Sequence, residues 1–124
     1  MINVNTTCIK NAKITSASIF VEDHGILTSY LQLDYAEGST QGFGGYALDS
    51  YNKATDKREP HIGLSIWVKG IMDTLDVDYW DKLPGTPVRV ALDSNGWNAT
   101  IIGIGHFLNN KWFEPKVAFK EFRE

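Results

Sequence analysis

The sequence contains little cysteine and little proline. Cys8 is the single cysteine, and there are 4 prolines among 124 residues. One cysteine can neither form an intramolecular disulfide nor supply the ligands of a cysteine-based zinc site. We therefore expect a fold held together by its apolar core, in a reducing compartment such as the cytoplasm.

Long apolar runs and an excess of basic charge are also missing. No stretch approaches the roughly 20 apolar residues that span a bilayer, and residues 1–7 lack the basic and apolar regions of a secretion signal. Lys and Arg number 12 against 15 Asp and Glu, a net charge of −3. The missing apolar run disfavours a membrane protein. The charge balance disfavours direct nucleic-acid binding, because no basic field gathers a polyanion.

The residues that are present suit one globular domain. Four Trp, five Tyr and six Phe supply the bulk for one well-filled core. We expect a single domain over residues 1–124, in which residues 1–11 form a weakly ordered lead-in or an edge strand. Regular structure is expected to start near Ala12.

Two β-hairpins are predicted. Residues 13–21 and 26–35 are rich in β-branched and aromatic residues around Gly25, and residues 87–93 and 97–108 flank the turn pair Asn95-Gly96. Turn geometry fixes which residues oppose each other. The first hairpin pairs Val21 with Leu27, Ala17 with Leu31 and Thr15 with Leu33; the second pairs Val90 with Ile101, Leu92 with Ala99 and Val88 with Gly103.

One amphipathic helix is predicted over residues 63–76. Its apolar side chains recur at intervals of three and four: Leu64, Trp67, Val68, Ile71, Met72 and Leu75. Residues 41–49 predict a third strand, residues 50–60 an exposed loop, and Pro115 the first residue of a short C-terminal helix. The fold class is therefore α+β: an antiparallel sheet of about five strands with the helix on one face and the short helix at its edge.

A glycine-rich segment matches a dinucleotide-binding fingerprint in form only. The spacing is Gly42-x-Gly44-x-x-Ala47, but no helical pattern follows to hold a pyrophosphate. A strand with bulges is the preferred interpretation. The alternative is a ligand pocket lined by Gly42, Phe43, Gly44, Gly45 and Tyr46.

Residues suited to catalysis are scattered along the chain. His24, His61 and His106 lie in different predicted elements, and no nucleophile elbow or metal-ligand spacing occurs. Asp49 is a further candidate for acid–base work, with no partner indicated by its position. We therefore expect no enzyme, no catalytic residue, no metal site and no cofactor.

A cluster of carboxylates surrounds the predicted end of the helix. Asp73, Asp76, Asp78 and Asp81 lie within nine residues, and Tyr79 and Trp80 stand among them. Because aromatic residues are enriched where partners dock, these six residues are the candidate partner-binding surface. The alternatives are a solvated acidic face and aromatic side chains that cover the core.

Several motifs together resemble a family of small proteins encoded by bacteriophages and prophages. The resemblance spans about Lys13 to Phe119 and implies only a setting: a phage accessory gene expressed in the bacterial cytoplasm. It implies no activity and no binding residue. The motifs are Glu22-Asp23-His24-Gly25-Ile26-Leu27-Thr28, Gln41-Gly42-Phe43-Gly44-Gly45-Tyr46-Ala47-Leu48-Asp49, Trp80 with Leu83-Pro84-Gly85, Val88-Arg89-Val90, Ile104-Gly105-His106 and Trp112-Phe113.

Three hypotheses for the function follow. The first is a non-enzymatic inhibitor of a host defence complex, of the anti-CRISPR kind, which acts by protein–protein contact. The second is a module that sequesters a small ligand or nucleotide signal. The third is a phage accessory protein that contacts the DNA-metabolism machinery. The oligomeric state is open, and a homodimer is among the expectations.

Overall fold

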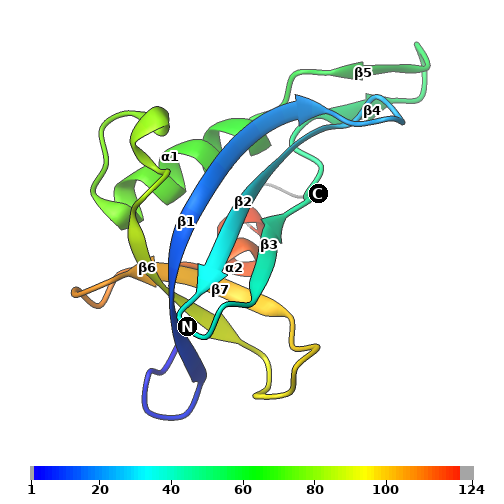
Figure 1. The fold of residues 1–124 in the computed structure, drawn as a ribbon. Coiled ribbons are helices and arrows are strands. Elements are labelled where there is room, and N and C mark those ends of the chain that lie inside the picture. The colour runs from blue at the N-terminus through cyan, green and yellow to red at the C-terminus, as the bar shows by residue number, and fades with distance from the viewer. Residues whose placement is uncertain (1, 121–124) are drawn as a thin grey trace.

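The computed structural model describes residues 2–120. Six strands form one antiparallel sheet in the order β3-β2-β1-β6-β7-β8 (Figure 1). The strands are β1 (Cys8–Val21), β2 (Leu27–Tyr35), β3 (Thr40–Gly44), β6 (Pro87–Leu92), β7 (Ile101–His106) and β8 (Trp112–Phe113). Two helices, α1 (Gly63–Leu75) and α2 (Pro115–Lys120), complete an α+β fold, which confirms the predicted class.

The strand count exceeds the expected five because two short pairings escaped prediction. The segment predicted as an exposed loop forms a separate hairpin of β4 (Ser50–Asn52) and β5 (Lys57–Glu59). The two-residue strand β8 extends the main sheet beside β7. The third strand ends at Gly44, five residues before its predicted end at Asp49.

Strand β1 is the longest element and belongs to both halves of the sheet. Its residues 12–21 pair with β2, and its residues 8–13 pair with β6. The strand therefore starts at Cys8, four residues before the predicted onset of regular structure at Ala12. Past Lys13, β1 continues beyond the end of its pairing with β6 (Figure 1).

The predicted register of the first hairpin is confirmed for the two pairs nearest to its turn. Val21 opposes Leu27 and Ala17 opposes Leu31. The third predicted pair is wrong, because a β-bulge between Ile14 and Ser16 places Ile14 opposite Leu33. An extra residue in one strand moves every later pair by one position.

The predicted register of the second hairpin is wrong. Val90 opposes Ile104, Leu92 opposes Ile101 and Val88 opposes His106. Asn95-Gly96 does not form a two-residue turn between the strands; it lies inside a wider loop.

Helix α1 covers the apolar side of the sheet and begins and ends close to the predicted limits. Trp67, Ile71 and Leu75 are buried, and the Trp67 ring lies 5.2 Å from Phe43 and 5.6 Å from Phe113. Helices α1 and α2 contact each other and β7. Within residues 2–120, no helix is both long and apolar enough to cross a membrane. A short 3-10 helix, η1 (Trp80–Lys82), leads from α1 toward β6.

Candidate functional site

Most carboxylates of the predicted acidic surface are paired with lysines. Lys69 Nζ lies 2.6 Å from Asp73 Oδ1, one turn along α1, and Lys82 Nζ lies 2.7 Å from Asp78 Oδ1. The Lys82 ammonium lowers the pKa of the Asp78 carboxyl. Asp81 forms no ion pair with any residue of the described range. Neighbouring ammonium groups therefore balance part of the negative charge of this segment.

Asp76 holds the end of α1 against the turn between β7 and β8. Its backbone is left-handed (φ 57°), and its N–H donates to the carbonyl oxygen of Met72. Its carboxylate lies 2.5 Å from Lys111 Nζ and 3.2 Å from His106 Nε2. The Lys111 ammonium holds the pKa of this carboxyl below its ordinary value. The carboxylate therefore has partners within the fold and is not a free negative charge.

The two aromatic residues of the same segment have different environments. Tyr79 is 64% exposed, and the Lys82 ammonium lies 5.0 Å from the centre of its ring. Trp80 is half-buried and packs against the hydrophobic core. Tyr79 is therefore available to a partner, whereas Trp80 mainly covers the core.

The glycines of the predicted pocket allow β3 to lie close to β2. Gly44 has φ 142°, and a Cβ added there would overlap the carbonyl oxygen of Ser29. A Cβ on Gly45 would lie 2.5 Å from the Tyr30 hydroxyl oxygen, whereas Gly42 has room, with its nearest neighbour 3.4 Å away. Gly44 and Gly45 therefore have a steric reason to be glycine.

The aromatic residues of this segment point into the core. Phe43 is 2% exposed, and the Tyr46 ring lies 5.6 Å from both Trp67 and Phe119. Gly45 borders a hollow of 160 Å³, and Tyr46 borders another of 330 Å³ on α2. Ligand pockets usually enclose about 300–1,000 Å³. The five residues thus do not line one common pocket, and the hollow beside the glycines is small for a nucleotide.

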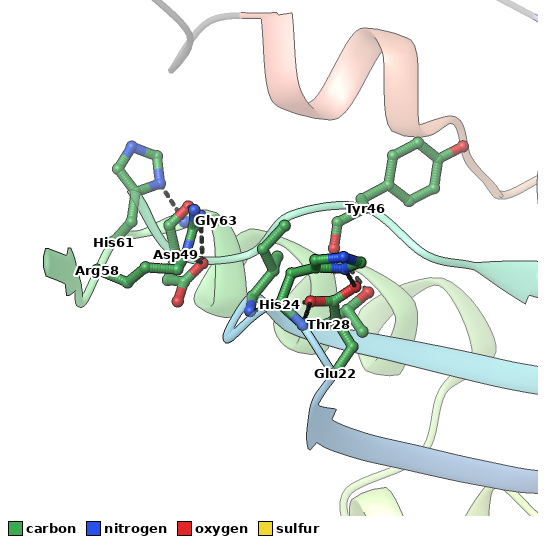
Figure 2. A network of polar contacts seen from close by, with 9 residues as sticks. Glu22, His24, Thr28, Tyr46, Asp49, Arg58, His61 and Gly63 are labelled. Atoms are coloured by element: carbon green, nitrogen blue, oxygen red, sulfur yellow. Dashed lines mark hydrogen bonds and ion pairs between the residues drawn. The ribbon is translucent and has the colours of Figure 1, made fainter. Parts of the chain in front are cut away.

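The end of the molecule at the β1–β2 turn carries a network of polar contacts (Figure 2). Glu22 accepts hydrogen bonds from the backbone N–H groups of His24 and Ile26, and its other oxygen lies 3.4 Å from His24 Nδ1. Thr28 donates to the carbonyl oxygen of Tyr46 at 2.8 Å. These bonds close the turn and attach the segment after β3 to β2.

Asp49 and Arg58 form the least exposed ion pair of the described residues. Asp49 Oδ1 accepts hydrogen bonds from Arg58 Nε at 2.9 Å and Nη2 at 2.7 Å (Figure 2). The Asp49 side chain is 11% exposed and that of Arg58 is 25% exposed. The Arg58 guanidinium lowers the pKa of the Asp49 carboxyl. The pair attaches the β4–β5 hairpin to the chain that leaves β3.

The histidines have separate partners. His61 Nδ1 accepts the Gly63 N–H at the start of α1, and His24 lies beside Glu22. His106 Nδ1 accepts two backbone N–H groups of the β7–β8 turn, so its Nε2 carries the proton that faces Asp76. Residues 2–120 contain no group of three or more His, Cys, Asp or Glu side chains that could hold a metal ion.

A fully exposed tryptophan marks a surface that sequence reasoning missed. Trp97 is 99% exposed in residues 94–98, which we call the Trp97 loop. The base of the loop is closed by Asp93 and Thr100: the Asp93 N–H donates to the Thr100 carbonyl at 3.0 Å, and the Thr100 N–H donates to Asp93 Oδ1 at 2.9 Å. The loop is thus held at its base while the indole faces water.

A groove of about 550 Å³ lies beside the Trp97 loop; we call it the Tyr35 groove. Its floor is a chain of hydrogen bonds, from the Tyr35 hydroxyl to Gln41 Oε1 at 2.6 Å and from Gln41 Nε2 to the Ala99 carbonyl at 3.0 Å. Burial raises the pKa of the Tyr35 hydroxyl to about 12, so Tyr35 is a neutral donor at physiological pH. The lining residues include Lys10, Glu37, Gln41, Trp97 and Asn98.

Charged groups stand at one side of the groove. Lys10 Nζ lies 5.1 Å from the centre of the Tyr35 ring and 3.5 Å from Glu37 Oε2. The groove therefore offers an aromatic wall, one cation, one anion and amide groups within one concave surface. This combination suits recognition of a polar chain that also carries an apolar side chain.

One sequence signal could have identified this surface. Trp97 directly follows the turn pair Asn95-Gly96, and a tight turn places its first flanking residues at the tip of a hairpin. The predicted two-residue turn instead places Trp97 at the start of a strand, so its full exposure is not predicted.

Comparison with known proteins adds no relative: no protein-family model, curated protein or solved structure matches this chain.

Proposed function

We propose that this chain is a non-enzymatic binding protein that docks onto a protein partner through the Trp97 loop and the Tyr35 groove. The observation that carries the proposal is the complete exposure of Trp97 at the rim of a concave surface. An exposed indole ring leaves a large apolar surface in contact with water, so its burial by a partner is favourable. Tryptophan is also enriched among the interface residues that dominate binding energy.

The composition of the loop supports the same function. Trp97 is flanked by Ser94, Asn95, Gly96 and Asn98, all small or polar. Antibody binding loops use the same mixture, in which a rigid aromatic side chain supplies contact area and Ser, Asn and Gly adapt their hydrogen bonds. Because the base of the loop is closed by backbone hydrogen bonds, less conformational entropy is lost when a partner binds.

The acidic segment is the weaker docking surface. Asp73, Asp76 and Asp78 each have a lysine partner, so a basic partner would have to replace existing ion pairs. Exposed pairs of this kind contribute only about 0–1 kcal/mol each, so exchanging one pair for another adds little binding energy. Tyr79 remains exposed there and serves as a comparison residue for experiments.

The partner class comes from the resemblance to phage proteins. We propose a host defence complex in the bacterial cytoplasm as the partner, blocked by steric occupation of its surface. The separate partners of His24, His61 and His106 support a function through contact, since acid–base catalysis requires such groups to converge on one site.

The test begins with affinity capture from the bacterial host by the wild-type chain, followed by identification of the captured protein by mass spectrometry. That protein is then purified, and its affinity is measured for the wild type, Trp97→Ala and Tyr79→Ala. We expect Trp97→Ala to weaken binding about 30-fold or more, the effect of losing about 2 kcal/mol at a dominant interface residue. Tyr79→Ala is the matched control, an exposed aromatic outside the surface.

Three results would contradict the proposal. They are the absence of any captured protein, equal affinities of the wild type and Trp97→Ala, and a larger loss for Tyr79→Ala. A captured protein from outside the defence machinery would overturn the partner class while leaving the docking surface in place.

A further inference from the structure

The outer part of β1 has an open edge. Backbone pairing with β6 ends at Lys13, and Ile14 still exchanges hydrogen bonds with Thr86 and Gly85. Beyond Ile14, β1 bonds only to β2 among the described residues. One side of the strand thus presents backbone groups without a protein partner.

The residues that face this open edge follow from the antiparallel pattern. The Glu22 N–H donates to the Ile26 carbonyl, so Glu22 bonds toward the β2 side. Backbone groups point alternately to the two sides of a strand. The backbone N–H and C=O groups of Phe20 and Ser18 therefore also point to β2. Those of Val21, Ile19 and Ala17 point to the open edge.

This edge lacks the usual protection against pairing. Natural edges carry charged residues, proline or a bulge that twists them away. Residues 14–21 contain no charged residue and no proline, and the one bulge lies at the inner end, between Ile14 and Ser16. Ile19 is 41% exposed and Val21 is 64% exposed.

We propose that a second copy of the chain covers this edge, with the two β1 strands antiparallel about a two-fold axis at Ile19. Ile19 then faces Ile19 of the second copy, and Ala17 faces Val21. The three residues that point outward in each copy meet their counterparts, which gives about six backbone hydrogen bonds, two for each such pair. The two sheets become one continuous sheet.

A second copy fits this edge because the edge is complementary to itself. The outward-facing set is symmetric about Ile19, and the small Ala17 is placed opposite the larger Val21. Antiparallel self-pairing also brings no like charges together, since residues 14–21 carry none. An interface that uses the same patch on both copies is the commonest kind in homo-oligomers.

The interface is independent of the Trp97 loop. The Tyr35 groove lies beside Lys10 and Leu92, near the start of β1, whereas the open edge lies near its end. A dimer through this edge therefore leaves both docking loops free, and the two proposals can fail separately.

The first test measures the molar mass by sedimentation over a wide range of protein concentration. We expect the wild type to shift from monomer to dimer as its concentration rises. Ile19→Lys places two ammonium groups opposite each other at the axis, so this variant is expected to stay monomeric. Its melting temperature is expected to equal that of the wild type at concentrations where the wild type is monomeric. Ile102→Lys is the matched control: Ile102 is 36% exposed on β7, a strand with neighbours on both sides, and its variant is expected to dimerise like the wild type.

The second test fixes the register by cross-linking in a Cys8→Ser background. Hydrogen-bonded antiparallel pairs have Cα atoms about 5.5 Å apart, a separation that a disulfide spans. Ile19→Cys is therefore expected to give a disulfide-linked dimer on mild oxidation. Val21→Cys is the control, because its counterpart in the second copy lies about four residues away along the ladder, roughly 13 Å.

Each outcome decides the proposal. A wild type that is monomeric at every concentration overturns it, as does a dimer that persists in Ile19→Lys. Equal cross-linking by Ile19→Cys and Val21→Cys overturns the register. An edge that binds an extended peptide of another protein while the chain stays monomeric shows that a different occupant covers it, and this also overturns the proposal.

Discussion

The Gln41 side chain donates a hydrogen bond from Nε2 to the carbonyl oxygen of Ala99, at 3.0 Å and across 58 residues of sequence. This bond connects β3, at one end of the sheet order, with Ala99, the residue that directly follows the Trp97 loop. Gln41 also accepts the Tyr35 hydroxyl hydrogen at 2.6 Å. One amide therefore holds the floor of the groove and the base of the docking loop together.

Replacement of Gln41 is expected to loosen the Trp97 loop. Gln41→Ala leaves the Ala99 carbonyl and the Tyr35 hydroxyl without this partner, and we expect a loss of about 1–2 kcal/mol in the free energy of unfolding. Chemical denaturation measures the loss, and hydrogen exchange of the loop amides measures the loosening. Thr40→Ala, an exposed position on the same strand, is the control. Unchanged exchange in the loop would show that Gln41 does not hold it.

The glycines of β3 are expected to differ sharply in their tolerance of alanine. Gly44→Ala forces a Cβ against the Ser29 carbonyl at a positive φ, so we expect a loss of at least about 2 kcal/mol or a failure to fold. Gly42→Ala has room beside Tyr30 and is expected to change stability by less than about 0.5 kcal/mol. Thermal unfolding of both variants is the measurement. Similar losses at both sites would contradict the steric explanation.

We expect the left-handed backbone conformation of residue 76 to affect the melting temperature more than the charge of its side chain does. Asp76→Asn keeps a residue type that tolerates the left-handed backbone, so its melting temperature is expected to stay near that of the wild type. Asp76→Val introduces a β-branched residue at φ 57° and is expected to lower the melting temperature by about 3–6 °C. A large loss for Asp76→Asn would instead assign the stability to the contacts with Lys111 and His106.

The Asp49–Arg58 pair predicts a stability difference that depends on pH. The pKa of Asp49 is lowered in the folded protein, so its stabilising contribution is present above the ordinary carboxyl pKa and is lost as the pH falls through the lowered value. At pH above about 5, Asp49→Asn is expected to cost about 1–2 kcal/mol. We expect this difference between wild type and variant to shrink below about pH 4. Thermal unfolding across pH checks it, and a difference independent of pH would exclude this carboxylate as its source.

The two hairpins show how far a local pattern determines register. In the first hairpin, Gly25 has a positive φ and its N–H donates to the Glu22 carbonyl, and the pairs nearest to this turn, Val21–Leu27 and Ala17–Leu31, are those that the sequence predicts. The bulge after Ile14 leaves no mark in the alternation of apolar residues. In the second hairpin, Asn95-Gly96 does not form a two-residue turn, because the Asp93 carboxylate accepts the Thr100 N–H and closes a wider loop.

The candidate site was harder to predict because its contacts join distant segments. The lysine partner of Asp76 is Lys111, which lies 35 residues later, so the sequence displays this carboxylate but not its ion pair. The Tyr35 groove needs β1, β2, β3 and the Trp97 loop together. Helix α1 was predictable because its signal is local: six apolar residues at helical spacing between residues 63 and 76.

The close approach of α1 to β8 has a consequence for how the molecule melts. Gly70 lies in the middle of α1, where a Cβ would lie 2.5 Å from the Phe113 ring. A central glycine lowers the intrinsic helicity of a segment of only 13 residues, and its first turn has no acidic residue. Such a segment is stable as a helix only while the sheet is present, so we expect helix and sheet to be lost in one cooperative transition.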